Sequence, residues 1–463
     1  MTAQSIVIFG GTGDLTYRKL LPSLYNLYAK GKWKAGYDIL AIGRRDYDDA
    51  AYRESAAPWI RKFAQTKMDD GNLAGFLGGV HYLEMDFTDS SQYGRFSAYE
   101  KAHPATAVII YLAVAPRFFT VIAEGVAQAT ERRDLHIVLE KPFGDDLPDA
   151  TKLNTLLVET FGKDNIYRID HYLGKEMVRN ILAIRCGNLV FSRLWDNQSI
   201  ASVQISALEQ VGVETRGGYY DQSGAMKDMV QNHLLQILTI VALENPSDAS
   251  TMHEQQLDVI SHLRPVTDAA SSVVFGQYEG YRNEDKVSPV STTETYVALR
   301  LFIDTPRWKD VPFLLRTGKK CDRREIEVVI TFKRVDPQID PDVLVIKIQP
   351  TEGVDIRFNI KKPGDEGGLA VAEMDFCQSC QDIFHLNTPE AYERMLEACM
   401  HGDATWFSQW NQIETSWKFI NALRKACDQA GVVVFPYKQG SAGPKEADLL
   451  ALTPDERFDA FRA

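Results

Sequence analysis

The hydrophobic pattern divides the chain into two parts with different kinds of element. In the first third, short and almost continuous apolar runs alternate with amphipathic stretches at helical spacing. The expected strands are residues 6–9, 39–42, 80–83, 108–112 and 137–139, and the expected helices include 19–29 and 118–129. Continuous apolar strands that alternate with helices predict a doubly wound parallel sheet covered on both faces.

After about residue 175 the strands become alternating in character. They are expected at 202–207, 296–303, 325–333, 343–349 and 354–361, joined by polar turns such as "DPQIDPD" and "KKPGDEGG". The longest apolar run, 234–243, is interrupted by Gln236 and Thr239 and predicts a buried helix rather than a membrane span. We expect an α/β domain over residues 1-175 and an α+β domain over residues 176-463. The second is the larger, with a mainly antiparallel sheet covered by helices.

The acidic charge balance limits the possible partners. The 463 residues include 63 acidic and 51 basic side chains, for a formal net charge of -12. Such a charge repels nucleic acid and anionic membranes, so an anionic ligand needs a local basic cluster. The chain shows no export signal or membrane span, and we expect a cytoplasmic protein.

The six cysteines are scattered and suit reduced thiols better than a disulfide framework. Cys377 and Cys380 form the one CxxC pair. A zinc site or a redox motif is the alternative there, with His385 as the nearby candidate ligand. Two ordinary buried thiols and no bound metal are the expectation.

The stretch "SIVIFGGTGDLTYRKL" suggests a nucleotide site. Its glycines follow a strand and precede a helix at the first βα turn, where the backbone can approach a pyrophosphate. Thr16 stands where the dinucleotide fingerprint has a small residue, and a glycine-rich turn without ligand is the alternative. The candidate cofactor-binding residues of this Rossmann-like turn are Gly10, Gly11, Thr12, Gly13, Asp14 and Leu15.

The end of the second strand indicates which nucleotide binds. An NAD site usually has a carboxylate here for the ribose 2′-hydroxyl, whereas this chain has Arg44 and Arg45 after Gly43. Guanidinium groups suit a 2′-phosphate because they bind phosphate in a bidentate manner. We therefore expect NADP as the cofactor.

Several motifs occur together in one order: "GGTGDL", "YLAVAP", "EKPFG", "RIDHYLGKE", "GGYYD", "DMVQNHLLQ" and "VPFLLRTGK". In this order they closely resemble the glucose-6-phosphate dehydrogenase family over nearly the whole chain. The resemblance implies oxidation of glucose 6-phosphate at C1 to 6-phosphogluconolactone, the first step of the pentose phosphate pathway. It also implies hydride transfer to NADP, a site in the cleft between the domains, and a homodimer or homotetramer built on the second sheet.

The segment "RIDHYLGK" is rich in groups that could surround a phosphoryl group. By the resemblance, His171, Tyr172 and Lys175 bind the substrate phosphate and Asp170 is directed toward the catalytic histidine. That histidine is His233, the implied general base. Taken alone, His233 lies in an apolar helical stripe and would be interpreted as a core histidine. An imidazole titrates near working pH, and a carboxylate can fix its tautomer.

Further roles follow from the same resemblance. Glu209 and Asp228 would accept hydrogen bonds from sugar hydroxyls, and Lys319 would reach the substrate. Lys141 would lie between sugar and nicotinamide, with a cis peptide bond to Pro142, and Asp86 would contact the cofactor.

The chain also departs from the family. Thr16 and Tyr17 stand where the family usually has a lysine near the nucleotide phosphates, and Arg323 and Arg324 fall where the family's basic residue varies. Neither arginine is assigned to the site. The alternative functions are an EKP-type dehydrogenase of an unphosphorylated sugar and a non-catalytic nucleotide-sensing relative.

Overall fold

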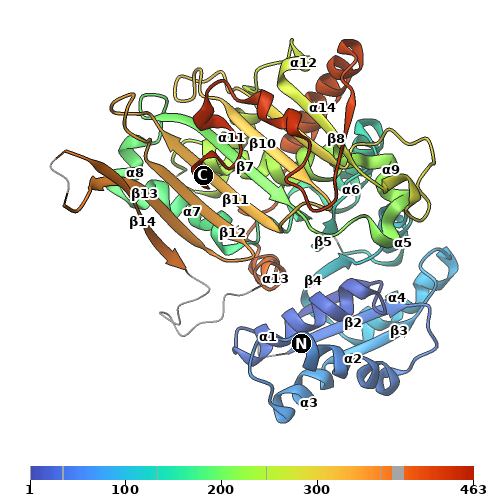
Figure 1. Ribbon diagram of the computed structural model, residues 1–463. Helices are drawn as coiled ribbons and strands as arrows, with labels where there is room; N and C mark the ends of the chain where they lie inside the picture. The colour runs from blue at the N-terminus through green and yellow to red at the C-terminus, as the bar shows by residue number, and fades with distance from the viewer. Residues whose placement is uncertain are drawn as a thin grey trace. The chain divides into compact units, whose positions relative to one another are not determined.

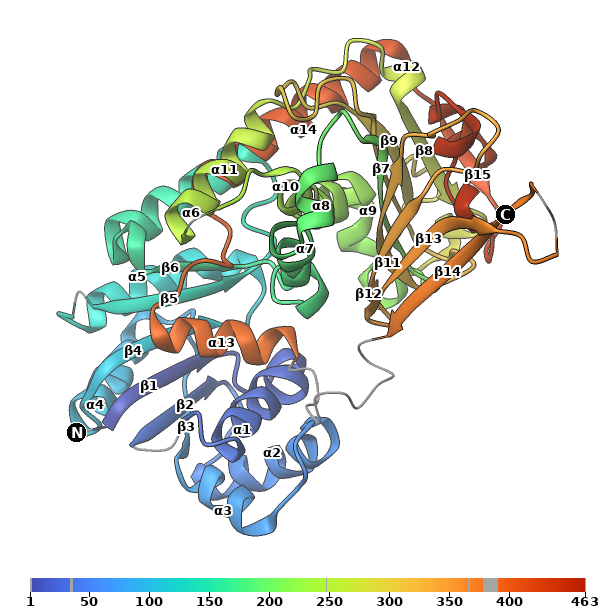
Figure 2. The same cartoon turned by 90° about the vertical axis from the view of Figure 1, so that its left-hand side faces the viewer.

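The computed structural model describes residues 2–33, 36–132, 134–246, 248–364, 367–377 and 390–462. The chain divides into two compact units (Figure 1 and Figure 2). The first unit comprises Met1–Gly174 and a later segment, Asn387–Trp410, and the second comprises Lys175–Leu386 and Asn411–Ala463.

A six-stranded sheet, entirely parallel, forms the centre of the first unit. Its strand order is β3-β2-β1-β4-β5-β6. The five expected strands fall within β1 to β5, and the doubly wound parallel sheet is confirmed. The sixth strand was not expected. The strands are β1 (Thr2–Phe9), β2 (Tyr37–Gly43), β3 (Val80–Glu84), β4 (Ala105–Leu112), β5 (Leu135–Glu140) and β6 (Ile166–Ile169).

Helices cover both faces of this sheet, as the alternation of side chains along β1 requires. Ile6 and Ile8 join the core beneath helices α1 and α2, whereas Phe9 packs against Tyr93 and Phe96 of α4. The helices are η1 (Thr16–Leu20, a π-helix), α1 (Leu21–Ala29), α2 (Asp49–Phe63), α3 (Asp70–Gly78), α4 (Tyr93–Ala102), α5 (Phe119–Ala129) and α6 (Leu147–Phe161). Short 3₁₀ turns are η2 (Ser90–Gln92), η3 (Pro116–Phe118) and η4 (Lys163–Asn165).

One segment returns to the first unit from far along the chain. Helix α13 (Ala391–His401) packs on α1, and its buried Met395 and Leu396 join the core of this unit. Glu393, also buried, accepts hydrogen bonds from Lys30 at 2.5 Å and Asn26 at 3.2 Å. The expected boundary placed this helix in the second domain. The helix belongs to the first unit instead, because its apolar face and the buried Glu393 pack against the region of α1.

The second unit contains a nine-stranded sheet of order β14-β13-β12-β11-β7-β10-β9-β8-β15. All pairings are antiparallel except β7 with β10 and β8 with β15, which confirms the mainly antiparallel sheet. The strands are β7 (Ile200–Leu208), β8 (Val273–Tyr278), β9 (Tyr296–Leu301), β10 (Phe313–Gly318), β11 (Glu325–Phe332), β12 (Val343–Gln349), β13 (Gly353–Lys361), β14 (Leu369–Cys377) and β15 (Val434–Tyr437).

Helices lie along one face of this sheet, with α7 in contact with β12 (Figure 2). They are α7 (Glu176–Gly187), α8 (Leu189–Leu194), α9 (Gly217–Ala225), η6 (Met226–Leu234, a π-helix), α10 (Leu235–Ala242), α11 (Ala249–Ser261), α12 (Ala269–Ser272) and α14 (Trp410–Ala430). The 3₁₀ turns are η5 (Glu214–Arg216), η7 (Tyr281–Asn283), η9 (Lys445–Leu450), η10 (Pro454–Glu456) and η11 (Ala460–Arg462). Helix α10 is buried along its whole length, as the apolar run predicted.

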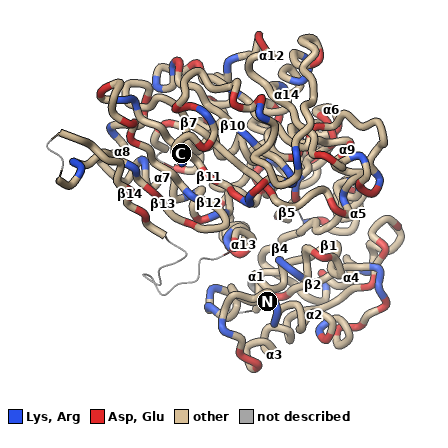
Figure 3. Tube along the Cα trace, viewed as in Figure 1, with Lys and Arg blue, Asp and Glu red and all other residues tan. Residues whose placement is uncertain are grey.

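Charged residues of both signs are interspersed along both units (Figure 3). Among the described residues, no helix combines the length and the apolar character that crossing a membrane would require.

A buried ion pair holds the C-terminal segment on the second sheet. Arg316, in β10, is 2% exposed and donates to both carboxylate oxygens of Asp459, at 3.0 and 2.8 Å. Burial alone would raise the pKa of Asp459, but hydrogen bonds and charge from Arg316 and Arg323 outweigh it and hold that pKa well below its usual value. The C-terminal segment therefore supplies the carboxylate that compensates the buried charge of Arg316 in the sheet.

We predict that Asp459→Asn lowers the free energy of unfolding by about 3–5 kcal/mol, because it leaves a buried guanidinium without its counter-charge. Asparagine tolerates the φ of 66° at this position, so backbone strain is not the cause. The control is Asp455→Asn, which breaks the more exposed pair with Arg334 and should cost only about 0–1 kcal/mol. Urea denaturation measures both, and equal losses would contradict the prediction.

Candidate active site

The predicted site residues of the first unit follow the carboxyl ends of its parallel strands. Gly10 comes directly after β1, Arg44 after β2, Lys141 after β5 and Asp170 after β6. Asp86 lies two positions beyond the end of β3. Because all these strands run in one direction, the residues gather at one edge of the sheet, where open α/β sheets bind their ligands.

The loop after β1 has a shape that only glycine permits. Gly10 has a φ of +91°, and a Cβ there would lie 2.3 Å from the carbonyl oxygen of Ala113. A Cβ on Gly11 would lie 2.7 Å from Cβ of Ala41. The N–H groups of both glycines donate to the carbonyl of Ile42, at 3.0 and 2.8 Å. These hydrogen bonds hold the loop against β2, and its tight backbone is the shape that a nucleotide-binding turn requires.

The residues that accompany the glycines in this loop differ in exposure and in their polar contacts. Asp14 is exposed and forms an ion pair with Arg18 at 2.8 Å, whereas Thr12 and Leu15 are half-buried. Thr16 is fully buried and its hydroxyl donates to the carbonyl of Gly10 at 2.9 Å. This hydrogen bond braces the glycine turn from behind.

Tyr17 explains the departure from the family at this loop. Its ring is buried and stacks on Trp59, with centroids 5.7 Å apart, and its hydroxyl pairs with Ser55 at 2.9 Å. A lysine could not fill that aromatic cluster. The position consequently contributes packing beneath the loop rather than a cation beside it.

The two arginines after β2 are not equivalent. Arg45 is tied down: its backbone is hydrogen-bonded to the hydroxyl of Tyr82, and a side-chain hydrogen bond to Tyr47 raises its pKa. Arg44 is exposed, and its guanidinium makes no hydrogen bond or ion pair with any described residue. Arg44 is therefore the arginine of the two whose guanidinium has all its donors available. Asp86 lies near this charge; hydrogen bonds from Thr88, more than Arg44, lower its pKa.

The end of β5 holds a residue that the sequence analysis did not single out. Lys141 has the expected cis bond to Pro142. Just before it, Glu140 is half-buried and accepts a hydrogen bond from Tyr111 at 2.6 Å. Burial raises the pKa of Glu140 to about 7, although hydrogen bonds from Tyr111 and Tyr392 oppose the shift. An acid as the last residue of an apolar strand was the available signal.

Asp170 and its neighbours form a compact turn after β6. Asp170 is 2% exposed, and its Oδ1 accepts a hydrogen bond from the backbone N–H of Tyr172 at 2.9 Å. Tyr172 is buried, and the half-buried His171 ring lies 5.0 Å from it, centroid to centroid. On its other side His171 stacks on Tyr392 of α13, 6.5 Å away. The returning helix thus supports the predicted phosphate-binding turn.

In the second unit, strand register pairs two of the predicted residues. β7 and β10 are parallel neighbours, with Leu208 opposite Gly318. The next residues, Glu209 and Lys319, therefore leave the sheet side by side. The ammonium of Lys319 donates to the carboxylate of Glu209 at 2.5 Å. This ion pair lies directly after the ends of β7 and β10.

Asp228 and His233 both lie on η6, so the expected helix is present and takes the form of a π-helix. Five positions separate them, and five is the hydrogen-bonded step of a π-helix, so both fall on one side of it. The side chains are buried, with Asp228 7% and His233 0% exposed. Tyr219 brings its hydroxyl to 3.5 Å from Asp228. Wide helical turns of this kind occur often at functional sites.

Tyr220 is the second residue that sequence reasoning missed, although "GGYYD" was among the motifs. The ammonium of Lys319 lies 5.1 Å from the centre of its ring. Burial raises the pKa of Tyr220 well above its usual value, and nearby carboxylates, including those of Asp228 and Glu209, add to the shift. Tyr220 therefore sits among the residues predicted to bind the sugar.

Lys175 lies at the amino end of α7 and donates to the side chain of Gln349 at 2.7 Å.

The structure thus brings the predicted substrate-binding residues together in two sets. Asp170, His171 and Tyr172 form one turn in the first unit. Glu209, Lys319 and Asp228 surround Tyr220 in the second.

The cysteine expectation was wrong at one position. Cys377, on β14, is half-buried and disulfide-bonded rather than a buried thiol. Cys380 and His385 lie outside the described residues. The free cysteines in the described part of the chain are Cys186, Cys321, Cys399 and Cys427.

A cluster of acids in the second unit has the spacing of metal ligands. Glu325, Glu327 and Asp459 bring oxygen atoms within 4.8 Å of one another. Arg323 and Arg462 form ion pairs with these acids, so their charge is already compensated by the protein.

Two family models match consecutive parts of the chain. Residues 7–180 match the model described as glucose-6-phosphate dehydrogenase, NAD binding domain. Residues 182–459 match the model described as glucose-6-phosphate dehydrogenase, C-terminal domain.

Individual proteins are similar over their whole length. Glucose-6-phosphate 1-dehydrogenase of Bacillus subtilis is 39% identical over 477 residues, covering 96% of this chain and 96% of its own. A solved structure of glucose-6-phosphate dehydrogenase in complex with its substrate glucose-6-phosphate superposes with a TM-score of 0.88 at 30% identity, covering 96% of this chain and 95% of the other. The enzyme from Mycobacterium avium gives 0.84 at 31% identity, with 97% and 96% covered.

Proposed function

The chain belongs to the glucose-6-phosphate dehydrogenase family, and from this we propose that it oxidises glucose 6-phosphate at C1 to 6-phosphogluconolactone, the first step of the pentose phosphate pathway. The observation that carries the proposal is the match of both family models along almost the full chain. NADP is the cofactor, and when bound it accepts the hydride from the sugar.

The chemical step needs a base, because the C1 hydroxyl must lose a proton as hydride leaves carbon. We assign that base to His233, whose imidazole can take the proton near neutral pH. The family resemblance makes Asp170 its carboxylate partner, with the role of holding the productive tautomer and stabilising the imidazolium. The burial of both side chains supports this, since exclusion of water strengthens such an interaction.

The substrate is bound by two sets of groups. His171, Tyr172 and Lys175 are proposed to hold the 6-phosphate, which only a cluster of donors can do in so acidic a chain. Glu209 and Asp228 are proposed to accept hydrogen bonds from sugar hydroxyls. Lys319 also reaches the substrate, and it is held ready by its contacts with Glu209 and the ring of Tyr220.

The cofactor is assigned to the edge of the first sheet. The glycine turn would receive the pyrophosphate on backbone N–H groups, with Thr12, Asp14 and Leu15 around it. Arg44, with Arg45 assisting, would bind the 2′-phosphate. Lys141 is proposed to lie between sugar and nicotinamide, and Asp86 near the adenosine end. We propose that residues 1-175, together with the returning helix α13, form the NADP-binding domain, and that the rest of residues 176-463 mainly binds substrate and forms the oligomer.

The alternatives fit less well. A dehydrogenase of unphosphorylated sugars would have no use for the donors of "RIDHYLGK", and a sensor without chemistry would not need both Asp170 and His233. The full-length family match also favours neither.

A homodimer or homotetramer is proposed through the second sheet. Its edge strand β14 has exposed apolar side chains on both faces, among them Val371 at 47%, Met374 at 57% and Phe376 at 38% exposure. Open apolar edge strands tend to be covered by another chain. We also propose a cytoplasmic location, which suits the free thiols, and no nucleic-acid partner, which suits the charge of -12.

The proposed function is tested by following the absorbance of reduced nicotinamide with glucose 6-phosphate and with glucose as substrates. We expect turnover with glucose 6-phosphate, and Lys175→Ala should raise its KM by about tenfold or more. Activity with glucose should barely change, because it lacks the phosphate. Lys152→Ala removes an equal charge from an exposed helix position and is the control. Equal effects on both sugars would rule out the phosphate role.

The cofactor assignment predicts that Arg44→Ala weakens NADP binding by about tenfold to a hundredfold, the value of a charge-assisted hydrogen bond. NAD binding should hardly change, since NAD lacks the 2′-phosphate. Arg61→Ala, which removes an exposed arginine paired with Asp70, should affect neither cofactor. Fluorescence titration of each reduced cofactor measures the two dissociation constants, and a parallel loss for both would disprove the assignment.

The assignment of His233 predicts that His233→Asn lowers kcat by about a hundredfold to ten-thousandfold while substrate binding is kept. Asp170→Asn should also lower kcat, and the double variant should be little worse than His233→Asn. His136→Asn alters another histidine, half-buried in β5, and should lower the melting temperature without a comparable loss of kcat. If His233→Asn behaves like this control, His233 is a core residue and the mechanism is wrong.

A further inference from the structure

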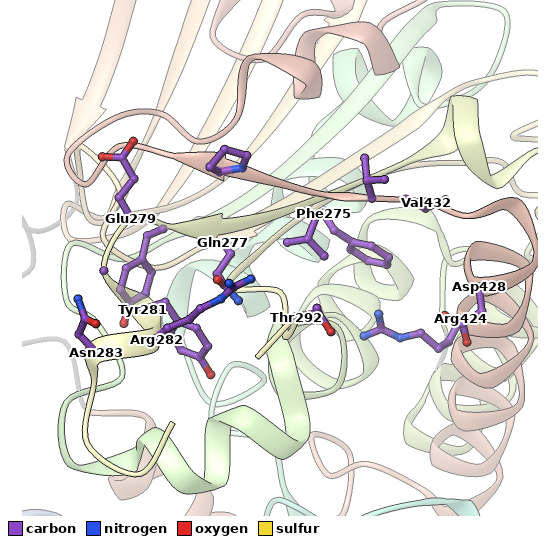
Figure 4. A pocket seen from close by; sticks show the side chains of 15 residues that line it. Phe275, Gln277, Glu279, Tyr281, Arg282, Asn283, Thr292, Arg424, Asp428 and Val432 are labelled. Atoms are coloured by element: carbon purple, nitrogen blue, oxygen red, sulfur yellow. The ribbon is translucent and has the colours of Figure 1, made fainter. Parts of the chain in front are cut away.

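A cavity of about 750 Å³ lies in the second unit, lined by β8, β15, the carboxyl end of α14 and the loop after β8 (Figure 4). None of the residues assigned above to substrate or cofactor lines it. Its volume is in the range of small-molecule sites. The proposed function therefore leaves a sizeable cavity without a ligand assigned to it.

Arg282 supplies an unused guanidinium edge to this cavity. Its Nε donates to the carbonyl of Ser291 at 2.9 Å, and its terminal nitrogens make no hydrogen bond or ion pair within the described structure. Gln277 donates to the same carbonyl at 3.1 Å, which holds the two side chains beside each other, as Figure 4 shows. The guanidinium is thus oriented by its Nε while its other donors stay available.

Arg424 of α14 supplies a second, more rigid guanidinium. It lies 4.8 Å from the centre of the Phe275 ring, and one nitrogen donates to Glu294 at 2.5 Å. Its side chain is about a third exposed, at 34%, so its remaining edge is open to the cavity. A guanidinium group can bind phosphate in a bidentate manner, so two of them on one cavity favour a phosphorylated ligand.

The other lining groups narrow the ligand class. Glu279 and Asp428 also line the cavity, and neither pairs with either arginine in the described structure. Such carboxylates can accept hydrogen bonds from hydroxyl groups. Val432 and Pro436 add an apolar wall. We propose that this cavity is a binding site for a phosphorylated sugar, free or within a nucleotide, with the phosphate on Arg282 and Arg424.

The same residues connect the cavity to the helix of the proposed base. Glu294, the partner of Arg424, is 3% exposed and accepts a hydrogen bond from the backbone N–H of Met226 at 3.2 Å. Met226 is the first residue of η6, which carries Asp228 and His233. A phosphate that draws Arg424 away from Glu294 would loosen this anchor. The effect on activity rests on the proposed function, whereas the binding itself does not.

Calorimetric titration of the full chain tests the binding. AMP and ribose 5-phosphate are the probes, each titrated with saturating glucose 6-phosphate present so that the substrate phosphate site is occupied. We expect binding that Arg282→Gln weakens by about tenfold or more. Arg264→Gln, which removes a half-exposed arginine paired with Asp304 and outside the cavity lining, should leave binding unchanged. Because Arg282 is exposed and makes one hydrogen bond, its variant is expected to fold.

The outcomes separate clearly. Similar affinity for both probes shows that the sugar phosphate suffices, and tighter binding of AMP shows that the base adds contacts; both support the site when Arg282→Gln weakens them. No binding of either probe, or binding that Arg282→Gln leaves intact, overturns it. In kinetic assays the bound probe should change the KM for glucose 6-phosphate by about fivefold, and Arg282→Gln should abolish the change. Unchanged kinetics with confirmed binding overturns the link to η6.

Discussion

Parallel strand pairing is the constraint on which the rest of this structure depends. Strands that run in one direction deliver their following residues to one edge of the sheet, whatever the distance between them in sequence. In the first unit this edge receives Gly10, Arg44, Lys141 and Asp170. In the second unit, β7 and β10 form a parallel pair near the centre of the sheet. This pairing brings Glu209 and Lys319 together. The same rule thus places predicted site residues side by side in a parallel sheet and in a mainly antiparallel one.

Helical irregularity adds the next level of positioning. Both π-helices of the described structure adjoin or carry residues predicted to form the site: η1 follows the glycine turn and η6 carries Asp228 and His233. A wide turn strains the helix and persists only where the surroundings support it. Around η6 that support includes Glu294, which accepts a hydrogen bond from the backbone N–H of Met226. Glu294 also accepts a hydrogen bond from the guanidinium of Arg424. Stability and site geometry therefore depend on the same buried carboxylate.

Long-range contacts complete each unit from distant parts of the chain. α13 returns to the first unit, where Glu393 meets Lys30 and Tyr392 stacks on His171. The C-terminal segment brings Asp459 to the buried Arg316 of the second sheet. Sequence pattern could not predict either contact, because an acid in an amphipathic helix or a terminal turn has the same local signature when it faces solvent. Burial of a charge pair is a property of the packed elements alone.

Local pattern and motif order by themselves determined the fold class, most strands, the glycine turn and the family. Arg44 after the second strand also indicated NADP as the cofactor. These follow from periodicity and from chemistry at fixed sequence spacing, which short-range physics controls. Tertiary structure alone decided that Tyr17 packs on Trp59, that Arg45 but not Arg44 forms a side-chain hydrogen bond to Tyr47, and that partial burial raises the pKa of Glu140 to about 7. It also decided that Tyr220 lies beneath Lys319 and that α13 belongs to the first unit. Each of these depends on which side chains meet across the fold, and burial and partner choice are set only when distant segments pack.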